Sequence, residues 1–581
     1  MRSVRDQTDE TEFHTPLPDG YQLGQTRYVA VFGTVMSGLG KGIFSSSVAK
    51  LLKDKSLRVS PIKLEGYLNI DSGTLNPYRH GEVFVLDDGM ECDMDLGTYE
   101  RMLDQNLSRE NFATSGQIYR NVLDKERAGD YLGRDVQMIP HVTGEVKLRL
   151  RELAVKTSAD VVFVEVGGTV GDIENAFYIE ALREMNYEEG AGSVLFVALT
   201  YVLRPPALGE QKSKAAQLGI KRLMESGVHP HVIACRCETP VTDKVRQKIS
   251  VYTNVPLQRV FSMHDLPSIY MLPEQMREAG LDSEIVQLLD LGARVNSATD
   301  ARAALEWQEF TARLARPEHE VRIGITGKYT ALRDSYASII KALEHAGGAN
   351  RAHVKVEWID TTDIDDDNVA ERLAGVDGVI VPGGFGVRGT AGKIAVVRHV
   401  REQGIPYLGI CLGFQMAVVD YARNVCGLDD ADSTEINPDC EHPVVSILPE
   451  QKQIEGLGGN MRLGGQDVVI TPGTLAAELF AADAAAGEAS GRVRERFRHR
   501  FEVDPEYVET LEEGGLIFSG RHPEHPIMQI LELSRDVHPY FIAAQFHPEL
   551  TSRPLTPQPM FRGLVAAALA RRHETTGQPA C

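Results

Sequence analysis

The run from Tyr28 to Gly42 places one lysine, Lys41, inside a glycine-dense turn that follows a short apolar stretch. The composition of Ile43–Leu52 predicts a helix directly after the turn, so the expected order is strand, loop, helix. Glycines allow the backbone N–H groups of such a loop to surround phosphate oxygens, and the lysine adds a positive charge. The pattern predicts a phosphate loop made of Ser37, Gly38, Leu39, Gly40, Lys41 and Gly42.

This loop departs from the strict pattern G-x-x-x-x-G-K-[ST] at two positions. Val35 stands where the first glycine belongs, and Gly42 replaces the residue that carries a hydroxyl. Ser45, Ser46 and Ser47 are able to supply that hydroxyl one helical turn later. The alternative is a glycine-rich turn whose lysine is incidental, and the rest of the first half favours the phosphate loop.

A carboxylate stands at the end of a continuously apolar run, residues 160–165, with glycines after it. Such runs are typical of parallel strands covered on both faces, whose carboxyl ends line ligand crevices. Glu165 is therefore expected to contact magnesium or a nucleotide. An earlier acidic patch is either a solvated loop or part of a Mg²⁺ site, because Mg²⁺ binds a few carboxylates together with phosphate oxygens. The patch consists of Asp87, Asp88, Glu91, Asp93 and Asp95.

The second half contains a cysteine between two glycines, Gly-Ile-Cys411-Leu-Gly, after an apolar run and before a helical pattern. Small residues on both sides permit the sharp turn of a nucleophile elbow, and a helix N-terminus favours a thiolate. The base and the residue that orients it are predicted in Gln-Phe-His547-Pro-Glu549, which again follows an apolar run. A buried structural cysteine is the alternative, and the glycine bracket disfavours it.

Large folded domains must hold these residues, and the composition is that of an ordinary globular protein. The chain has 581 residues, 43% hydrophobic and 25% charged, which predicts roughly two to four domains. A net charge of -21 argues against a general binder of nucleic acid or membranes, so phosphates need local basic clusters. The seven scattered cysteines predict neither a disulfide framework nor a paired zinc motif, and they favour the reducing cytoplasm. We expect no membrane-spanning run and no signal peptide.

Alternating apolar strands and helical patterns predict an α/β fold in both halves. Strands are expected at 57–64, 160–165, 193–200 and 231–235, and in the second half at 320–327 and 540–544. The polar, alanine-rich stretch between the halves is interpreted as a linker. The predicted organisation is a flexible N-terminal tail at 1–26, a parallel-sheet domain at 27–290, the linker at 291–319, a second α/β domain at 320–572 and a flexible C-terminal tail at 573–581.

The first half contains a series of motifs in a fixed order: Gly33–Gly42, Lys63-Leu, His80-Gly-Glu-Val-Phe-Val, Asp93-Met-Asp95-Leu-Gly, Ile139-Pro-His141 and Glu165-Val-Gly-Gly-Thr-Val-Gly-Asp-Ile-Glu174. In order and spacing this series resembles the synthase half of the CTP synthase family, and the similarity continues into the second half. The resemblance implies a P-loop domain like that of dethiobiotin synthetase, in which ATP phosphorylates O4 of UTP.

Site residues follow from the same resemblance. Lys41 and Lys63 would bind triphosphate, and Asp95 and Glu165 would hold Mg²⁺. The pyrimidine nucleotide would be bound by Asp172, Glu174, Lys212, Lys214, Gln217 and Lys248.

The order cysteine, histidine, glutamate in the second half resembles the class I glutamine amidotransferases, which implies release of ammonia through a γ-glutamyl thioester on Cys411. Ser-Thr-Glu435 and Arg496-Phe-Arg-His-Arg500-Phe-Glu again resemble CTP synthase specifically. By this match glutamine would be held by Gly384, Leu412, Gln415, Glu435 and Arg500. Backbone N–H groups near Gly384 and Leu412 would serve as oxyanion donors.

The resemblance implies the reaction UTP + ATP + glutamine + water to CTP + ADP + phosphate + glutamate. It also implies GTP as an allosteric activator of glutamine hydrolysis, CTP as an inhibitor and a homotetramer as the active form. Neither a nucleic acid polymer nor a membrane is expected as a partner.

Several positions around the pyrimidine site differ from the family pattern. Where the family has Lys-Leu-Asp-Pro-Tyr this chain has Lys63-Leu-Glu-Gly66-Tyr, and Val-Pro-Tyr is replaced by Val-Leu-Arg204. Lys-Thr-Lys-Pro-Thr-Gln has become Lys212-Ser-Lys-Ala-Ala-Gln217. These differences leave open a paralogue that aminates a modified pyrimidine nucleotide or resists CTP inhibition.

Two further alternatives are weaker. One is another P-loop amidotransferase, similar to a cobyrinic acid a,c-diamide synthase, which the His80-Gly-Glu-Val-Phe motif disfavours. The other is a structural or filament-forming regulatory paralogue. It is disfavoured by the intact set Lys41, Asp95, Glu165, Cys411, His547 and Glu549.

Overall fold

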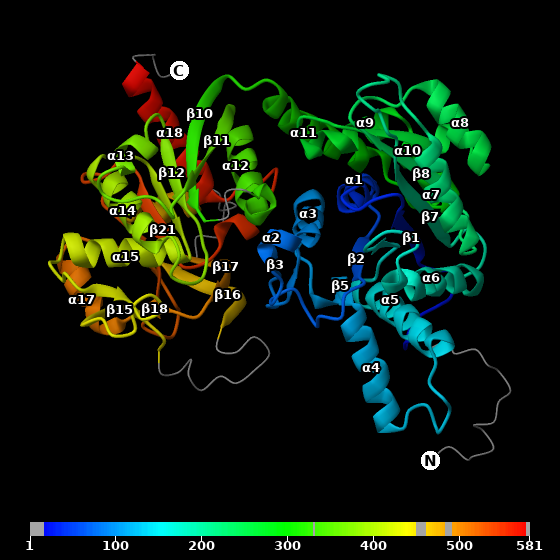
Figure 1. The fold of residues 1–581 in the computed structure, drawn as a ribbon, viewed down its shortest axis with the longest axis horizontal. Coiled ribbons are helices and arrows are strands. Elements are labelled where there is room, and N and C mark those ends of the chain that lie inside the picture. Colours follow the sequence, from blue (N-terminus) through cyan, green and yellow to red (C-terminus); the bar gives the residue numbers. More distant parts are fainter. Residues whose placement is uncertain (1–16, 329–331, 449–460, 483–490, 577–581) are drawn as a thin grey trace. The chain divides into compact units, whose positions relative to one another are not determined.

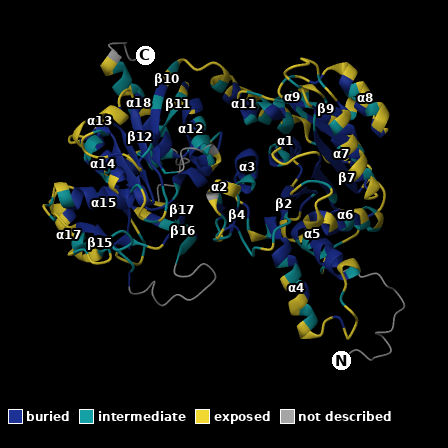
Figure 2. Cartoon of the chain, in the orientation of Figure 1, coloured by how far each residue is buried: buried dark blue, intermediate teal, exposed yellow. Residues whose placement is uncertain are grey.

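The computed structural model describes residues 17–328, 332–448, 461–482 and 491–576. These residues form two compact units, each with its own sheet (Figure 1). The first unit contains the chain up to residue 74 together with 98–308, and the second contains 75–97 and the chain from 309 onward. In both units the strands are buried and the outer faces of the helices are exposed (Figure 2), as expected for sheets covered on both sides. No helix in the described part of the chain is long and apolar enough to cross a membrane.

The sheet of the first unit has seven strands in the described chain, and all neighbouring strands are parallel. In spatial order they are β5 (Phe112–Thr114), β2 (Val59–Glu65), β6 (Val161–Val166), β1 (Arg27–Gly33), β7 (Val194–Tyr201), β8 (Val232–Cys237) and β9 (Val260–His264). The four strands predicted in this half are confirmed to within two residues at each end. Because β1 lies between β6 and β7, the loops after β1 and β6 leave the same edge of the sheet side by side.

Helices of the first unit connect these strands. They are α1 (Lys41–Asp54), α4 (Ser115–Ala128), α5 (Thr143–Thr157), α6 (Ala176–Glu188), α7 (Lys214–Glu225), α8 (Asp243–Thr253), α9 (Leu272–Glu278) and α10 (Leu281–Leu288). The division between the two units falls within two further helices, α3 (Met94–Leu103) and α11 (Ser297–Ala315). The stretch interpreted as a linker is therefore mostly one helix, α11.

A network of charged side chains is buried between α5 and α6. The Arg151 guanidinium has no exposed surface and lies 2.7 Å from a Glu188 carboxylate oxygen and 2.8 Å from one of Glu189. Lys147, also buried, lies 2.5 Å from Glu184 and 2.7 Å from Glu188. Removing one member of such a network leaves its partners charged and without compensation in a medium of low dielectric.

We expect replacement of Arg151 by methionine to lower the free energy of unfolding of the first unit by about 3–5 kcal/mol. Arg183→Met is the matched control, because Arg183 pairs with Glu180 at 2.6 Å with 43% of its side chain exposed, and this change should cost at most about 1 kcal/mol. Urea denaturation followed by circular dichroism measures both. Equal losses for the two variants would contradict a stabilising role for the buried network.

The second unit has a mixed sheet of nine strands among the described residues. In spatial order they are β11 (Ala352–Asp360), β10 (His319–Gly327), β12 (Gly378–Val381), β13 (Tyr407–Ile410), β21 (Phe541–Ala544), β20 (Met528–Glu532), β19 (Ile517–Arg521), β16 (Arg462–Ile470) and β17 (Arg492–His499). The pairs from β11 to β21 are parallel and the pairs from β21 to β17 are antiparallel. The strands expected at 320–327 and 540–544 are present as β10 and β21.

Helices and a small sheet complete the second unit. The helices are α12 (Ala337–Ala349), α13 (Val369–Arg372), α14 (Thr390–Glu402), α15 (Leu412–Asn424), α16 (Leu475–Ala481), α17 (Pro505–Glu513) and α18 (Pro559–Thr576). The small sheet consists of β14 (Ala431–Ser433), β15 (His442–Ser446) and β18 (Glu502–Val503).

Residues 75–97 belong to a different unit from the one that the sequence predicts. The predicted first domain, 27–290, includes them, but they pack within the second unit, where they form α2 (Pro77–His80) and the hairpin of β3 (Val83–Val85) and β4 (Glu91–Asp93). The hairpin lies against β17: the Arg496 guanidinium donates to the Val85 carbonyl at 3.1 Å.

The described parts of both predicted tails, 17–26 and 573–576, are folded against or continuous with the neighbouring unit. Within 17–26, Tyr21 and Tyr28 share a hydrogen bond of 2.7 Å, and Gly24 N donates to Glu189 at 2.9 Å, so this stretch packs against the first unit. At the other end α18 continues to Thr576. Residues 1–16 and 577–581 lie outside the described residues.

Candidate functional site

The phosphate loop connects the central strand β1 to α1, which begins at Lys41 itself. Gly38 and Gly40 have φ values of 74° and 80°, in the left-handed region that glycine adopts without strain. Val35 also has a positive φ, 74°, although it is β-branched and replaces the glycine of the strict pattern. The loop therefore keeps the left-handed turn at this position without the glycine, at a cost on the order of 1–3 kcal/mol.

The side chain of Lys41 lies toward the loop that follows β6. Its Nζ donates to the carbonyl oxygen of Gly168 at 2.6 Å, and a Cβ added to Gly33 would lie 3.0 Å from that Nζ. The lysine predicted to bind phosphate and the glycine-rich loop after Glu165 are thus neighbours in the structure.

Lys63 and Glu165 occupy partner positions on the adjacent parallel strands β2 and β6. Lys63 Nζ lies 3.6 Å from a carboxylate oxygen of Glu165 and 3.2 Å from one of Glu65. The Tyr99 hydroxyl donates to the other Glu165 oxygen at 3.1 Å. Glu165 is 1% exposed, so burial, a lysine and a tyrosine fix the carboxylate that the sequence assigned to magnesium.

The second predicted magnesium ligand, Asp95, belongs to the other compact unit. Among the described residues, no group of three or more His, Cys, Asp or Glu side chains is arranged to hold a metal ion. Mg²⁺ does not require one, because it commonly binds through one or two carboxylates and completes its shell with substrate phosphates and water. A buried carboxylate such as Glu165, close to Lys63, fits that kind of binding.

Asp172 and Glu174 lie on the exposed loop between β6 and α6. Asp172 accepts a hydrogen bond from Thr169 N at 2.8 Å. Asn175, which the sequence did not single out, is buried and donates to the carbonyls of Gly167 and Thr169, both at 3.0 Å. Asn175 therefore sets the shape of the loop that carries the two predicted nucleotide-binding carboxylates.

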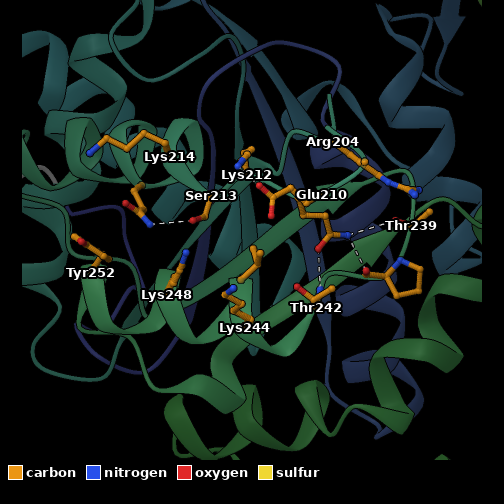
Figure 3. Close-up of a pocket in the computed structure, with 15 residues that line it drawn as sticks. Arg204, Glu210, Lys212, Ser213, Lys214, Thr239, Thr242, Lys244, Lys248 and Tyr252 are labelled. Carbon is orange, nitrogen blue, oxygen red and sulfur yellow. Dashed lines mark hydrogen bonds and ion pairs between the residues drawn. The ribbon is translucent and has the colours of Figure 1, made fainter. Parts of the chain in front are cut away.

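A pocket of about 850 Å³ lies where α7 and α8 begin (Figure 3). It collects four of the six residues predicted for the pyrimidine nucleotide, namely Lys212, Lys214, Gln217 and Lys248. Asp172 and Glu174 do not line it. Gln211 joins the two sides, because its side chain donates to the Pro240 carbonyl at 2.8 Å and accepts from Thr242 N at 2.9 Å.

The pocket is strongly basic in a chain of net charge -21. Arg204 and Lys244 line it in addition to the three predicted lysines, and one carboxylate, Glu210, is ion-paired with Lys212. The N-termini of α7 and α8 add positive potential. The sequence analysis did not select Lys244; in the structure it lies four residues before Lys248 on α8, on the same face of the helix. This charge and volume suit a polyphosphate group.

The cysteine predicted as a nucleophile occupies a strained turn between β13 and α15. Cys411 has φ 51° and ψ -101°, and its backbone N–H donates to the Ala544 carbonyl of the neighbouring strand β21 at 2.8 Å. A Cβ on Gly413 would lie 2.0 Å from the Val381 carbonyl oxygen, so only glycine fits there. These features are those of a nucleophile elbow.

His547 and Glu549 follow β21, the strand next to β13, and this adjacency brings them to the cysteine. His547 Nδ1 lies 2.7 Å from a Glu549 carboxylate oxygen. A Cβ on Gly383 would lie 3.0 Å from His547 Cε1 and 3.5 Å from Cys411 Cβ, so the imidazole and the cysteine side chain converge on this glycine. Burial alone would lower the pKa of His547, but the Glu549 carboxylate and Cys411 raise it to about 10. The Glu549 carboxylate thus stabilises the protonated imidazole of His547 beside Cys411.

The residues predicted to hold glutamine differ in their burial and in their contacts. Gln415 is buried on α15, donates to the Phe501 carbonyl at 3.0 Å, and has a side-chain oxygen without a partner among the described residues. Leu412 is buried and lies near Gly384, whereas Glu435 accepts from Gly386 N at 2.8 Å. Arg500 is exposed, just after β17.

The acidic patch and the arginines of β17, which lie far apart in the sequence, are in contact in the second unit. Arg498 Nε lies 2.7 Å from Glu91 and Arg494 lies 3.0 Å from Asp87, so part of the acidic patch is paired with arginines of β17. For these two carboxylates the structure therefore supports neither the solvated-loop interpretation nor the Mg²⁺ interpretation. The Arg498 carbonyl oxygen in turn lies 3.7 Å from Cys411 Sγ.

One sheet of this chain carries a phosphate loop, and the other carries a cysteine, a histidine and a glutamate at an elbow. Together these two sites define the class of protein: a glutamine-dependent ligase with a class I glutamine amidotransferase domain. Residues 27–291 match the family description "CTP synthase N-terminus", and residues 331–567 match "Glutamine amidotransferase class-I". The chain belongs to the CTP synthase family.

Similar proteins cover nearly the whole chain. The CTP synthase of Thermococcus kodakarensis is 49% identical over 94% of this chain and 99% of its own length. The CTP synthase of Synechococcus sp. (strain JA-3-3Ab) is 47% identical over 94% of this chain and 97% of its own length. Among solved structures, the glutaminase domain of Trypanosoma brucei CTPS with bound acivicin is 35% identical and covers 43% of this chain and 94% of that chain, with a TM-score of 0.39.

Proposed function

We propose that this chain converts UTP to CTP, consuming ATP and the amide nitrogen of glutamine. The products besides CTP are ADP, phosphate and glutamate, and the intermediate is UTP phosphorylated at O4. The observation that carries the proposal is that one chain, matched over 94% of its length by CTP synthases, has both a phosphate loop with Lys41 and an elbow with Cys411.

In the second unit Cys411 attacks the side-chain amide of glutamine. The imidazolium of His547, oriented by Glu549, protonates the departing nitrogen so that it leaves as ammonia, and a γ-glutamyl thioester remains. Backbone N–H groups near Gly384 and Leu412 stabilise the oxyanion. Water then releases glutamate, with His547 acting as the base.

In the first unit Lys41 and Lys63 bind triphosphate oxygens, and Glu165 would hold Mg²⁺. When bound, the ion neutralises phosphate charge during transfer. The four residues Lys212, Lys214, Gln217 and Lys248 hold the phosphates of the pyrimidine nucleotide in the pocket of Figure 3.

We further propose GTP as an activator, CTP as an inhibitor and a homotetramer as the active form. These proposals follow from membership of the family. The cysteines among the described residues are all free thiols, which suits an enzyme of the reducing cytoplasm.

The direct test is to incubate the purified protein with ATP, Mg²⁺ and glutamine, and to measure CTP and phosphate after adding UTP, dUTP, 5-substituted UTP or UMP. CTP is titrated against each acceptor. CTP formation that requires UTP and releases one phosphate per CTP is the expected result. Phosphate release that ignores the pyrimidine nucleotide would point to a different P-loop amidotransferase. Strong turnover of a modified acceptor, or weak CTP inhibition, would identify the paralogue that Arg204 leaves open.

Lys244→Ala is expected to raise the KM for UTP about 3- to 10-fold while the KM for ATP changes little, because it removes one cation from the exposed pocket. The increase should shrink at high salt. Lys156→Ala is the matched control, since Lys156 pairs with Glu110 on the same unit and does not line the pocket. Equal KM values for the two variants would show that Lys244 does not contact the nucleotide.

A further inference from the structure

A buried lysine contacts the loop Pro382–Gly384, which follows β12 and includes a proposed oxyanion donor. Lys393, on α14, is 3% exposed, and its Nζ donates to the Pro382 carbonyl oxygen at 2.7 Å. A Cβ on Gly384 would lie 3.9 Å from the same Nζ. The ammonium is therefore close to the loop Pro382–Gly384, which faces Cys411 and His547 through Gly383.

The hydrogen bond to Pro382 acts on the geometry of this loop. The Pro382 carbonyl and the Gly383 N–H belong to one planar peptide unit and point in opposite directions. Holding the carbonyl toward Lys393 therefore fixes the direction of the Gly383 N–H and limits the orientation of the next peptide, which carries the Gly384 N–H. Oxyanion donors are effective only when they are already aimed at the oxygen that becomes charged.

The charge of Lys393 acts on the same region. Burial, with a smaller contribution from Lys328, which follows β10, lowers the pKa of its ammonium to about 7, against the opposing effect of Cys411. Asp420 of α15 is engaged elsewhere, because it pairs with Arg401 of α14 at 2.8 Å. A buried ammonium is costly unless negative charge appears nearby, and the oxyanion formed when Cys411 adds to glutamine supplies that charge.

We propose that Lys393 is a positioning residue of the glutaminase: it holds the Pro382–Gly384 loop in its working conformation and places a positive charge behind the oxyanion. The proposal rests on the proposed function of Cys411. It does not involve the synthase site.

Lys393→Met tests the proposal, since methionine fills most of the volume but neither donates nor carries a charge. We expect kcat for glutamate release to fall about 10- to 100-fold, with the KM for glutamine changed less than about threefold, because the interaction acts on the transition state. Alkylation of Cys411 by iodoacetamide forms no oxyanion, so it should slow much less than glutamate release. CTP formation with ammonium chloride should also be unchanged.

The pH dependence provides a second readout. The ammonium is the acid form, so its contribution is present below its pKa and is lost as the pH rises through that value. The ratio of wild-type to Lys393→Met kcat should therefore fall between about pH 6 and about pH 9. Lys393→Arg, which keeps a charged donor, should retain more activity than Lys393→Met.

Several results would overturn the proposal. One is an unchanged kcat in Lys393→Met, and another is a loss of alkylation or ammonia-dependent synthesis as large as the loss of glutaminase activity, which would mark Lys393 as a residue of the fold. Lys341→Met is the control, because Lys341 lies on α12 of the same unit and pairs with Glu344 at 2.7 Å. If the wild-type protein itself releases no glutamate, the proposed function fails, and this outcome is distinct from failure of the Lys393 variant.

Discussion

Replacing Cys411 by alanine is expected to reduce glutamine-dependent CTP formation about 10⁴-fold or more, while ammonium chloride still supports CTP formation at the wild-type rate. The thiolate is the nucleophile, and neither His547 nor Glu549 replaces it. The synthase residues Lys41, Lys63 and Glu165 belong to the other compact unit, so they are unaffected by the change. The measurement is CTP formation with each nitrogen source at saturating UTP and ATP.

Cys426→Ala is the matched control. Cys426 is a half-buried thiol of the same unit, and its Sγ contacts the Thr510 carbonyl at 3.6 Å, away from the elbow. This variant should keep both activities. A folded Cys411→Ala protein that also loses ammonia-dependent synthesis would contradict the assignment of two separate sites.

Lys41→Ala is expected to lower both glutamine-dependent and ammonia-dependent CTP formation about 100-fold or more. Binding and transfer of phosphate precede use of either nitrogen source, and a lysine in a phosphate loop neutralises charge on the transferring group. In the structure its Nζ donates to Gly168 O at 2.6 Å, beside the loop after Glu165, so its loss also affects that loop. Initial rates with glutamine and with ammonium chloride test the prediction.

Lys156→Ala again serves as the control, because it removes a lysine of the same unit that pairs with Glu110 at 2.6 Å. Lys41→Ala should leave hydrolysis of glutamine in the absence of nucleotides intact, which demonstrates a folded protein. Near-normal ammonia-dependent turnover in Lys41→Ala would show that the phosphate loop is assigned incorrectly.

Local patterns predicted the strands and the elbow well. The run ending at Glu165 became β6, because a short, continuously apolar stretch fits a strand covered on both faces. The glycine bracket around Cys411 anticipated a positive φ and a contact too close for any side chain at Gly413. These features depend on a few neighbouring residues, and the sequence contains all of them.

Features that depend on distant contacts were not predictable in the same way. The sequence predicts residues 75–97 in the same domain as their neighbours in the chain, yet Asp87 and Glu91 are paired with arginines more than 400 residues further on. Lys393 reads as an ordinary helical lysine until the burial of α14 is known. Likewise, nothing local in the sequence shows that Lys244 and Lys248 line the same pocket as Arg204.

The position of the hairpin also bears on biosynthesis. Ribosomes make residues 75–97 long before β17, whose arginines bind Asp87, Glu91 and the Val85 carbonyl. During that interval the hairpin strands have no sheet to pack against, and a two-stranded hairpin alone is marginally stable in water. The flanking parts of the first unit are able to form their parallel sheet earlier. The nascent chain therefore carries this hairpin without the strand it packs against until β17 has been translated.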